Sequence, residues 1–269
     1  MLLEVRDARK VYRARRGGAE VVAVDSASLQ ARDGQFIAIV GESGSGKSTV
    51  ARMLLGLIPV TSGEIELDGT PVKGMSAGDR TRFRRNVQAV LQDPAGSLNP
   101  RKTVRRTIAE IVRLHDLARG REAVERKVIE ALEQVGLNPA ETFLDRYPTE
   151  LSGGQRQRVL IARAIVLDPK IIVADEAVSA LDASVKAGVL RLLVDLQRDL
   201  GVGYVFITHD LPVVKKVADY VYVMRGGRIV EHGPKDRIFD APTHDYTKTL
   251  LAASPVLDLA AQRQEPPTE

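Results

Sequence analysis

Glycine, lysine and serine residues stand together at the spacing that phosphate binding requires. Residues 41–48 read Gly-Glu-Ser-Gly-Ser-Gly-Lys-Ser and match the pattern G-x-x-x-x-G-K-[ST]. Glycines permit backbone conformations in which several N–H groups converge on phosphate oxygens. We expect Lys47 to reach the terminal phosphates of a nucleotide and the Ser48 hydroxyl to bind Mg²⁺. The segment therefore predicts a site for a nucleoside triphosphate.

Two acidic residues form a second candidate site. Asp175 and Glu176 directly follow the apolar run 171–174. Ligands of an open parallel sheet gather at the carboxyl ends of its strands. We expect Asp175 to hold Mg²⁺ directly or through water, and Glu176 to orient or deprotonate an attacking water. Taken alone, such a pair could equally cap the next helix. Beside a phosphate-binding loop, it predicts hydrolysis of the nucleotide.

The elements that must position these residues can be predicted from the apolar pattern. Continuous apolar runs predict strands that are covered on both faces, at 36–40, 171–174 and 204–208. Helical stretches follow the first two runs, at 49–55 and 184–200. Further strands are expected at 3–5, 21–24 and 64–67, and a terminal hairpin at 220–223 and 228–230. Between the two sites, apolar residues of 103–136 recur every three or four positions, which predicts a helical insert at about 93–158. The pattern is typical of an α/β protein.

Composition excludes several classes of protein. The chain has 269 residues, 44% of them hydrophobic, so it is not intrinsically disordered as a whole. It contains no cysteine, which excludes disulfides and thiolate metal sites. No run approaches the roughly 18 apolar residues that cross a bilayer, and the amino terminus lacks a secretory leader, so we expect a cytosolic protein. Basic clusters occur at 82–85 and 101–106, but the net charge of +4 is mild, and no nucleic-acid partner is expected.

A third motif carries a family resemblance. Residues 151–158 read Leu-Ser-Gly-Gly-Gln-Arg-Gln-Arg and resemble the signature motif of ATP-binding cassette (ABC) ATPases. The motifs also come in the order of that family: phosphate loop, Gln92, signature, acidic strand, Ser-Ala-Leu-Asp at 179–182, and His209 after the third strand. The set is similar to a complete ABC nucleotide-binding domain over about residues 2–233. This resemblance implies a P-loop NTPase fold with a RecA-like core, an N-terminal antiparallel β-subdomain and a helical signature subdomain.

The resemblance implies a role for each motif residue. Glu176, His209 and Gln92 would be catalytic, and Ser48, Gln92 and Asp175 would bind Mg²⁺. Tyr12 stands where the family places an aromatic ring that stacks on adenine. One departure is Ala177-Val178, where many members have Pro-Thr, and we expect no loss of activity from it. The residues expected to contact ATP are Tyr12, Gly41, Glu42, Ser43, Gly44, Ser45, Gly46, Lys47, Ser48, Thr49, Ser152, Gly153, Gly154, Gln155 and Asp182.

The family architecture also implies partners. Two cassettes stack head to tail, and each ATP lies between the phosphate loop of one and the signature of the other. This chain contains one cassette, so a second cassette chain, identical or different, is expected. Two transmembrane permease subunits would hold the pair on the cytoplasmic face of the inner membrane, and an extracytoplasmic solute-binding protein would act indirectly. The basic clusters are expected to flank the groove for a cytoplasmic helix of the permease.

Two further segments resemble one subfamily. Residues 93–101 (Asp-Pro-Ala-Gly-Ser-Leu-Asn-Pro-Arg) and 244–255 (beginning His-Asp-Tyr-Thr) resemble segments of dipeptide, oligopeptide and nickel importers. We therefore predict an ATP-hydrolysing subunit that energises import of di- or oligopeptides. A nickel importer cassette, another ABC transporter cassette and a non-transport ABC ATPase are the alternatives. The expected division is a nucleotide-binding domain at 1–240 and an extension at 241–269 with a disordered end.

Overall fold

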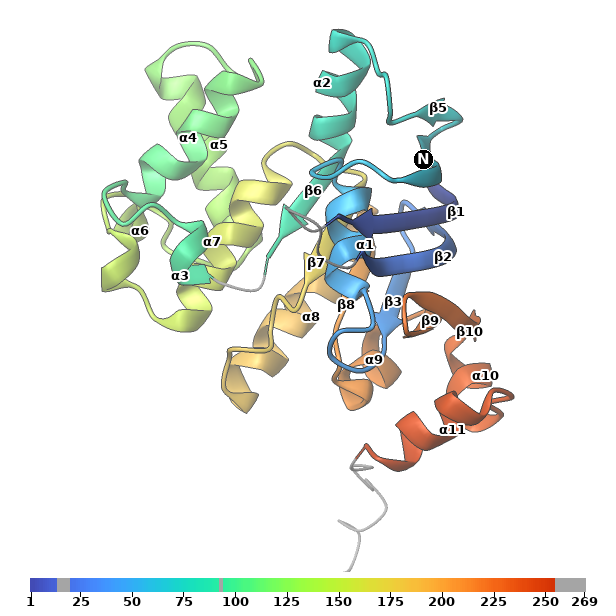
Figure 1. Cartoon of the computed structure of the whole chain (residues 1–269). Helices are drawn as coiled ribbons and strands as arrows, with labels where there is room; N and C mark the ends of the chain where they lie inside the picture. The colour runs from blue at the N-terminus through green and yellow to red at the C-terminus, as the bar shows by residue number, and fades with distance from the viewer. Residues whose placement is uncertain (14–19, 92–93, 255–269) are drawn as a thin grey trace, which may run out of the picture.

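The computed structural model describes residues 1–13, 20–91 and 94–254. Its centre is one ten-stranded mixed sheet in the order β5-β4-β1-β2-β10-β9-β3-β8-β7-β6 (Figure 1). The strand bounds are β1 Leu2–Tyr12, β2 Val21–Arg32, β3 Phe36–Val40, β4 Ser62–Leu67, β5 Thr70–Pro71, β6 Val87–Val90, β7 Ile171–Asp175, β8 Gly203–Ile207, β9 Tyr220–Arg225 and β10 Arg228–Pro234. The expected α/β fold is confirmed.

The two parts of the sheet differ in strand direction. β1 pairs antiparallel with β2 and β4, and β4 with β5. β6, β7, β8, β3 and β9 run parallel to one another. β10 returns antiparallel to β9 and meets β2 at one parallel pair, which joins the two parts. The carboxyl ends of β3, β7 and β8 therefore lie at one edge of the parallel part.

The parallel strands are apolar throughout because both of their faces are covered. Every residue of β3, β7 and β8 is buried. Ile37 and Ile39 belong to the same apolar cluster as residues of β1, β2 and the helix α1 (Lys47–Leu54). Phe36, Ala38 and Val40 face the opposite way, into a cluster with the helices α7 (Gly153–Ile165), α8 (Ala183–Leu200) and α9 (Leu211–Val217). The core thus consists of two layers with β3 between them.

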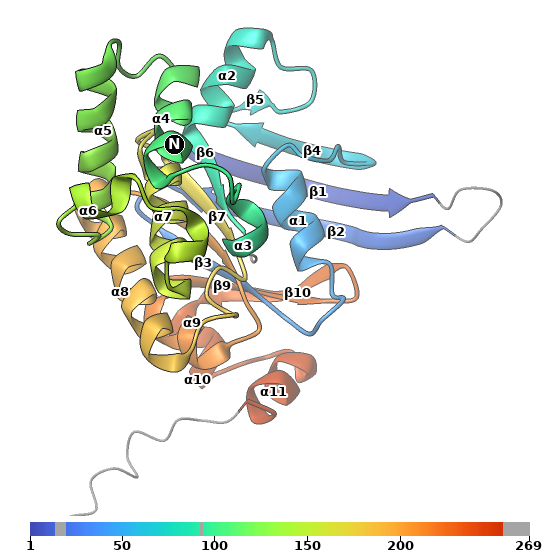
Figure 2. The same cartoon turned by 90° about the vertical axis from the view of Figure 1, so that its left-hand side faces the viewer.

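The predicted helical insert contains five helices, which stand to one side of the sheet (Figures 1 and 2). They are α3 Pro94–Ser97, α4 Val104–Leu114, α5 Arg121–Gln134, α6 Glu141–Leu144 and α7, with the 3-10 turn η1 Pro148–Glu150 before α7. The Thr103 hydroxyl accepts from the Arg106 N–H and caps α4. The periodic stretch 103–136 is two helices rather than one, because Asp116 and Gly120 adopt positive φ between them.

The remaining helices were not predicted. α2 (Ala77–Asn86) is almost entirely polar and buries only Phe83. The short helices α10 (Lys235–Asp240) and α11 (Asp245–Ala252) follow β10 and lie at the same end of the molecule as the loop after β3 (Figures 1 and 2). Within the described ranges, no helix combines the length and the apolar character needed to cross a bilayer. The tail after about residue 255, expected to be disordered, lies outside those ranges.

Candidate phosphate-binding site

The loop between β3 and α1 wraps around the amino terminus of the helix. Gly44 and Gly46 have φ values of 81° and 103°, and Gly46 is the N-cap of α1. A Cβ atom on Gly46 would lie 2.4 Å from the carbonyl oxygen of Ala23, and one on Gly41 would lie 2.1 Å from that of Met224. Glycine is therefore required at 41 and 46 by close backbone approach as well as by torsion. Backbone N–H groups at a helix start provide an anion site.

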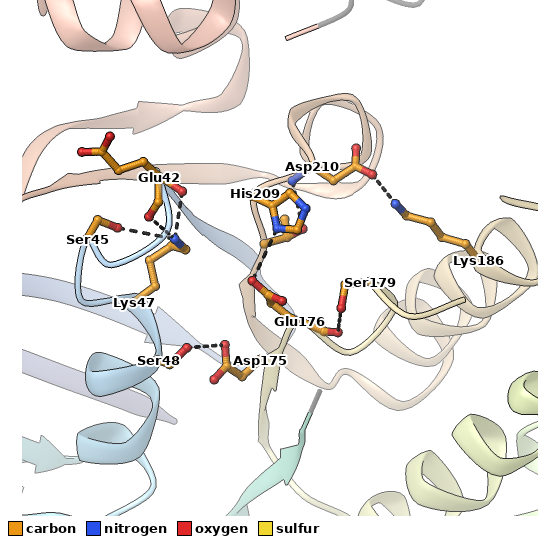
Figure 3. A network of polar contacts seen from close by, with 12 residues as sticks. Glu42, Ser45, Lys47, Ser48, Asp175, Glu176, Ser179, Lys186, His209 and Asp210 are labelled. Atoms are coloured by element: carbon orange, nitrogen blue, oxygen red, sulfur yellow. Dashed lines mark hydrogen bonds and ion pairs between the residues drawn. The ribbon is translucent and has the colours of Figure 1, made fainter. Parts of the chain in front are cut away.

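Lys47 supplies the positive charge of this loop. Its side chain folds back so that Nζ donates to the carbonyl oxygens of Gly41 (2.8 Å) and Glu42 (2.7 Å) (Figure 3). Lys47 is only 6% exposed, and among the described residues no carboxylate lies within ion-pair distance of it. Burial lowers the pKa of Lys47, against the opposing effect of nearby carboxylates. A buried ammonium group held by neutral oxygens favours a bound anion.

The first acidic residue lies against the phosphate loop. The Ser48 hydroxyl donates to Asp175 Oδ1 at 3.2 Å, which joins the start of α1 to the end of β7. Burial raises the pKa of Asp175, and neighbouring Glu176 raises it further, whereas the Ser48 hydroxyl, the Arg52 guanidinium and the Lys47 ammonium lower it. Burial therefore disfavours the ionised form of Asp175, and a bound cation would favour it.

Glu176 has a fixed backbone and a side chain that points to His209. Its φ is +48°, a left-handed conformation that costs a non-glycine residue on the order of 1 kcal/mol. Three hydrogen bonds hold its backbone: its N–H donates to the Ile207 carbonyl oxygen at 2.9 Å, and its carbonyl oxygen accepts from the Ser179 hydroxyl at 2.9 Å and the Ser179 N–H at 3.1 Å. Nδ1 of His209 lies 3.4 Å from Glu176 Oε1. Strain retained at such a position points to a functional residue.

One ion pair behind His209 was not predicted. Lys186 of α8 donates to Asp210, and Asp210 also caps α9 by accepting from the Val213 N–H (Figure 3). Burial raises the pKa of Asp210, but the Lys186 ammonium and the Val213 N–H lower it overall. The contact ties the loop that carries His209 to a long helix. No sequence pattern connects residues 186 and 210, so the sequence offered no signal for it.

The signature segment forms the start of α7. Ser152 is the N-cap: its Oγ accepts from the Gln155 N–H at 3.2 Å, and Gln155 Oε1 accepts from the Ser152 N–H at 2.9 Å. The predicted Gln155 side chain therefore completes a capping box. A Cβ on Gly154 would lie 2.5 Å from a Val185 methyl, so close packing on α8 requires glycine there. The N–H groups of Gly153 and Gly154, at the very start of α7, have no partner inside the helix.

Other predicted residues lie at the edges of this arrangement. Asp182 caps α8 by accepting from the Val185 N–H at 3.0 Å, which is a structural role in this chain. Tyr12 ends β1, is 39% exposed and pairs with Val21, two residues from the Ala23 carbonyl that approaches Gly46. Glu42, Ser43 and Gly44 are exposed along the loop, and Thr49 is half-buried. Gln92 lies outside the described residues.

The second basic cluster proves to be largely paired within the chain. Arg105 donates to Asp145 at 3.1 Å and also contacts Glu125. Lys102 and Arg106 both pair with Glu110. These contacts bind α4, α5 and the α6 region to one another and neutralise most of the positive charge. The expectation that the clusters flank a permease groove stays a prediction.

The donor set fits a magnesium ion better than a metal held by protein alone. Ser48 and Asp175 present a hydroxyl and a carboxylate oxygen to the same space, and oxygen is the ligand that Mg²⁺ prefers. The part of the chain that the structure describes holds no cluster of three or more metal-binding His, Asp or Glu side chains. Mg²⁺ commonly takes one or two protein oxygens and completes its shell with phosphate and water.

This fold and site define a nucleotide-binding P-loop ATPase domain: a glycine-rich loop with its lysine, an acidic pair and a histidine meet at the carboxyl ends of β3, β7 and β8 (Figure 3). Comparison with known proteins identifies the family. The model of the ABC transporter family matches residues 24–179. The model "Oligopeptide/dipeptide transporter, C-terminal region" matches residues 230–269. The chain therefore belongs to the ABC transporter family, as its motifs predicted.

Curated relatives agree with this assignment. The chain is 48% identical over 244 residues to "Glutathione import ATP-binding protein GsiA" of Salmonella paratyphi A, and 48% identical over 246 residues to that of Escherichia coli K12. The alignments cover 91% of this chain but 39% of each relative, so the chain spans well under half the length of these proteins.

Two solved cassettes share the fold. One is the ATP-binding cassette MJ0796 in a dimeric post-hydrolysis state with ADP and Pi, at TM-score 0.75 and 27% identity, over 87% of this chain and 98% of that one. The other is cbiO1 from Clostridium perfringens, part of the ABC transporter complex cbiONQ, at TM-score 0.75 and 28% identity, over 88% and 90%.

Proposed function

We propose that this chain binds and hydrolyses MgATP to energise an importer of di- or oligopeptides. One observation supports nucleotide binding above others: Lys47 is buried, donates to neutral oxygens of its own loop, and lies at a helix amino terminus beside Asp175. A triphosphate would supply the missing negative charge at Lys47. A divalent cation would supply the missing positive charge at Asp175. The two unbalanced charges together fit MgATP as one ligand.

The chemistry is divided among a few side chains. Lys47 and the loop N–H groups would bind the β- and γ-phosphates, and Ser48 and Asp175 would hold Mg²⁺, which would offset phosphate charge. Glu176 orients and deprotonates the attacking water from its fixed backbone position, and His209 contacts the γ-phosphate and holds the Glu176 carboxylate in place. Tyr12 stacks on adenine from the end of β1. The catalytic role of Gln92 is proposed on the basis of its motif alone.

The second half of the site comes from another cassette. Ser152, Gly153, Gly154 and Gln155 would meet the nucleotide of the partner through the amino terminus of α7. The dimeric MJ0796 cassette supports this arrangement in the family. Closure of the pair would exclude water from the γ-phosphate, and opening after hydrolysis would reset it. Two permease subunits hold the pair at the inner face of the membrane, and a solute-binding protein acts with them.

Peptides are the cargo that the comparisons favour. The names of the relatives refer to import of glutathione, which is itself a small peptide. The matched C-terminal region is named for oligopeptide and dipeptide transporters and covers residues 230–269. The cassette itself touches no cargo, so the peptide class rests on these relatives.

The Glu176→Gln variant tests the proposed hydrolysis. We expect it to bind MgATP with the affinity of the natural chain and to lose at least about a hundredfold in turnover, because the amide is no base. Glu133→Gln, an exposed change on α5, is the matched control and should retain full turnover. Steady-state hydrolysis by Glu176→Gln at the natural rate would refute the assignment.

The same variant tests the partners. Tagged Glu176→Gln protein would be recovered from detergent-solubilised host membranes with MgATP, and the captured proteins identified by mass spectrometry. A second cassette, two polytopic membrane proteins and a peptide-binding protein are expected. Recovery of ribosomal or DNA-repair proteins without membrane subunits would overturn the transporter proposal and leave the ATPase site standing.

A further inference from the structure

The C-terminal region reaches back to the phosphate loop. Tyr246, in the first turn of α11, is 9% exposed, and its hydroxyl accepts a hydrogen bond from the Glu42 N–H at 3.0 Å. The two residues are 204 positions apart in the chain. We propose that Tyr246 is a positioning residue for the phosphate loop, and that α11 must stay docked for the chain to bind nucleotide tightly. The inference rests on the proposed ATP binding and adds a control element to it.

The contact acts on the peptide group that holds the lysine. The Glu42 N–H donates to Tyr246, and the carbonyl oxygen of the same peptide group, which is that of Gly41, accepts from Lys47 Nζ at 2.8 Å. The next carbonyl oxygen, that of Glu42, also accepts from Lys47 Nζ, at 2.7 Å. Tyr246 thereby fixes the orientation of the loop at the residue that orients Lys47. This N–H points at a protein oxygen, so it is not among the donors left for phosphate. Without the hydroxyl, the loop has one restraint fewer and samples more conformations in the free protein. Binding of nucleotide would then cost more conformational entropy, because the loop and Lys47 must become ordered.

A second contact fixes the other side of the loop. The Gly227 N–H, in the turn between β9 and β10, donates to the Ser45 carbonyl oxygen at 3.0 Å. The guanidinium of Arg225, at the end of β9, lies 4.8 Å from the centre of the Tyr246 ring. One segment of chain thus holds the loop directly and also supports the ring of Tyr246. A cation over an aromatic face contributes on its own to the docking of α11.

A buried carboxylate anchors α11. Glu231 of β10 is 5% exposed; its Oε1 accepts from the Thr243 N–H (2.8 Å) and hydroxyl (2.7 Å), and its Oε2 from the His244 N–H (3.1 Å). His244 then caps α11, because its Nδ1 accepts from the Tyr246 N–H at 3.1 Å. A continuous series of contacts therefore connects the sheet, the α11 cap and the phosphate loop. This series of contacts fixes the position of Tyr246.

The effect of α11 docking on nucleotide affinity must equal the effect of bound nucleotide on α11 docking. If docked α11 strengthens nucleotide binding, bound nucleotide must strengthen the docking of α11 by the same factor. The region named for oligopeptide and dipeptide transporters would then adjust nucleotide affinity from within the cassette. Anything that bound or displaced α11 would change the affinity for ATP without touching the reacting atoms.

The Tyr246→Phe variant removes only the hydroxyl and tests the proposal. One lost hydrogen bond at a restrained loop should raise the Kd and KM for MgATP about three- to tenfold. We expect kcat at saturation to stay within about twofold, since no reacting group has changed. Tyr220→Phe is the matched control: its hydroxyl also has a partner, His232 Nδ1 at 2.7 Å, but it begins β9 and pairs with Ile37, at the far end of the strand from the loop.

Hydrogen exchange gives a second measurement that does not depend on turnover. In Tyr246→Phe, the amide of Glu42 should exchange faster than in the natural chain, and in Tyr220→Phe it should not change. MgATP added to the natural chain should slow exchange across residues 245–252. A merely structural role for Tyr246 would instead lower the melting temperature and kcat together, with KM unchanged.

The outcomes separate this inference from the proposed function. Natural affinity and natural Glu42 exchange in Tyr246→Phe, with α11 insensitive to MgATP, would overturn the positioning role and leave the ATPase proposal intact. Failure of the natural chain to bind MgATP at all, with Lys47→Ala no weaker than it, would overturn both. A raised KM with unchanged kcat and faster Glu42 exchange is the supporting result.

Discussion

Replacing Glu231 by glutamine should destabilise the fold in a way that depends on pH. Burial alone would raise the pKa of Glu231, but the nearby hydroxyl of Thr247, the N–H and hydroxyl of Thr243, and the N–H of His244 lower it to about 2 from 4.5. In each of its hydrogen bonds from Thr243 and His244, the carboxylate is the acceptor. Glutamine keeps one acceptor oxygen for Thr243 but directs an NH₂ group at the His244 N–H. Two donors then face each other in a buried place.

The magnitude follows from the shift in pKa. A difference of about 2.5 units between the folded and unfolded states corresponds to about 3 kcal/mol of stability at pH 7. Because the pKa is lowered on folding, this contribution is complete above pH 4.5 and is lost as the pH falls toward 2. At pH 3.5 about 2 kcal/mol should remain. The difference in free energy of unfolding between the natural chain and Glu231→Gln should therefore be smaller at pH 3.5 than at pH 7.

Urea unfolding of both chains at pH 7 and pH 3.5, followed by far-ultraviolet circular dichroism, measures this difference. Glu133→Gln, exposed on α5, is the control and should stay within about 0.5 kcal/mol of the natural chain at both pH values. A difference below about 1 kcal/mol at pH 7, or one that does not change with pH, would refute the assigned role of the Glu231 carboxylate.

Two further substitutions act on the phosphate site and on the signature helix. Lys47→Ala should weaken MgATP binding about ten- to a hundredfold, since a charge-assisted contact contributes roughly 1.5–3 kcal/mol. Calorimetry would measure this loss of affinity. The control, Lys73→Ala on the exposed loop after β5, should bind MgATP with the affinity of the natural chain. Ser152→Ala removes the N-cap of α7 and should cost about 1 kcal/mol of stability in thermal melts. It should also lower the ATPase rate of the paired cassettes more than that loss of stability accounts for, and a normal rate would argue against the trans role of Ser152.

Local patterns predicted the parts of the site that depend on local structure. The loop 41–48, the acidic pair and His209 each follow an apolar strand, and parallel strands bring their carboxyl ends to one edge. Strand direction was therefore enough to place Lys47, Asp175 and His209 together. The backbone torsion of Glu176 has no signal in the sequence, because glutamate gives no indication of a positive φ.

Features that depend on distant contacts could not be predicted. The Tyr246–Glu42 contact joins residues 204 positions apart through one hydroxyl, and no spacing or periodicity encodes it. Helix α2 was missed because nearly all its residues are polar, so it lacks the apolar stripe that reveals a surface helix. The break between α4 and α5 was missed because apolar residues continue at helical spacing on both sides of it.

The left-handed torsion at Glu176 has a consequence for evolution and engineering of this cassette. Glycine, and to a lesser degree asparagine, adopt that torsion with little steric cost, whereas glutamate does not. Selection for stability alone would therefore favour replacement of Glu176, and the catalytic role proposed for Glu176 predicts that selection for turnover opposes it. Position 176 should therefore be checked first in thermostable variants of this chain. The proposed role of Glu176 predicts that a gain in melting temperature from a substitution there is accompanied by loss of ATP hydrolysis.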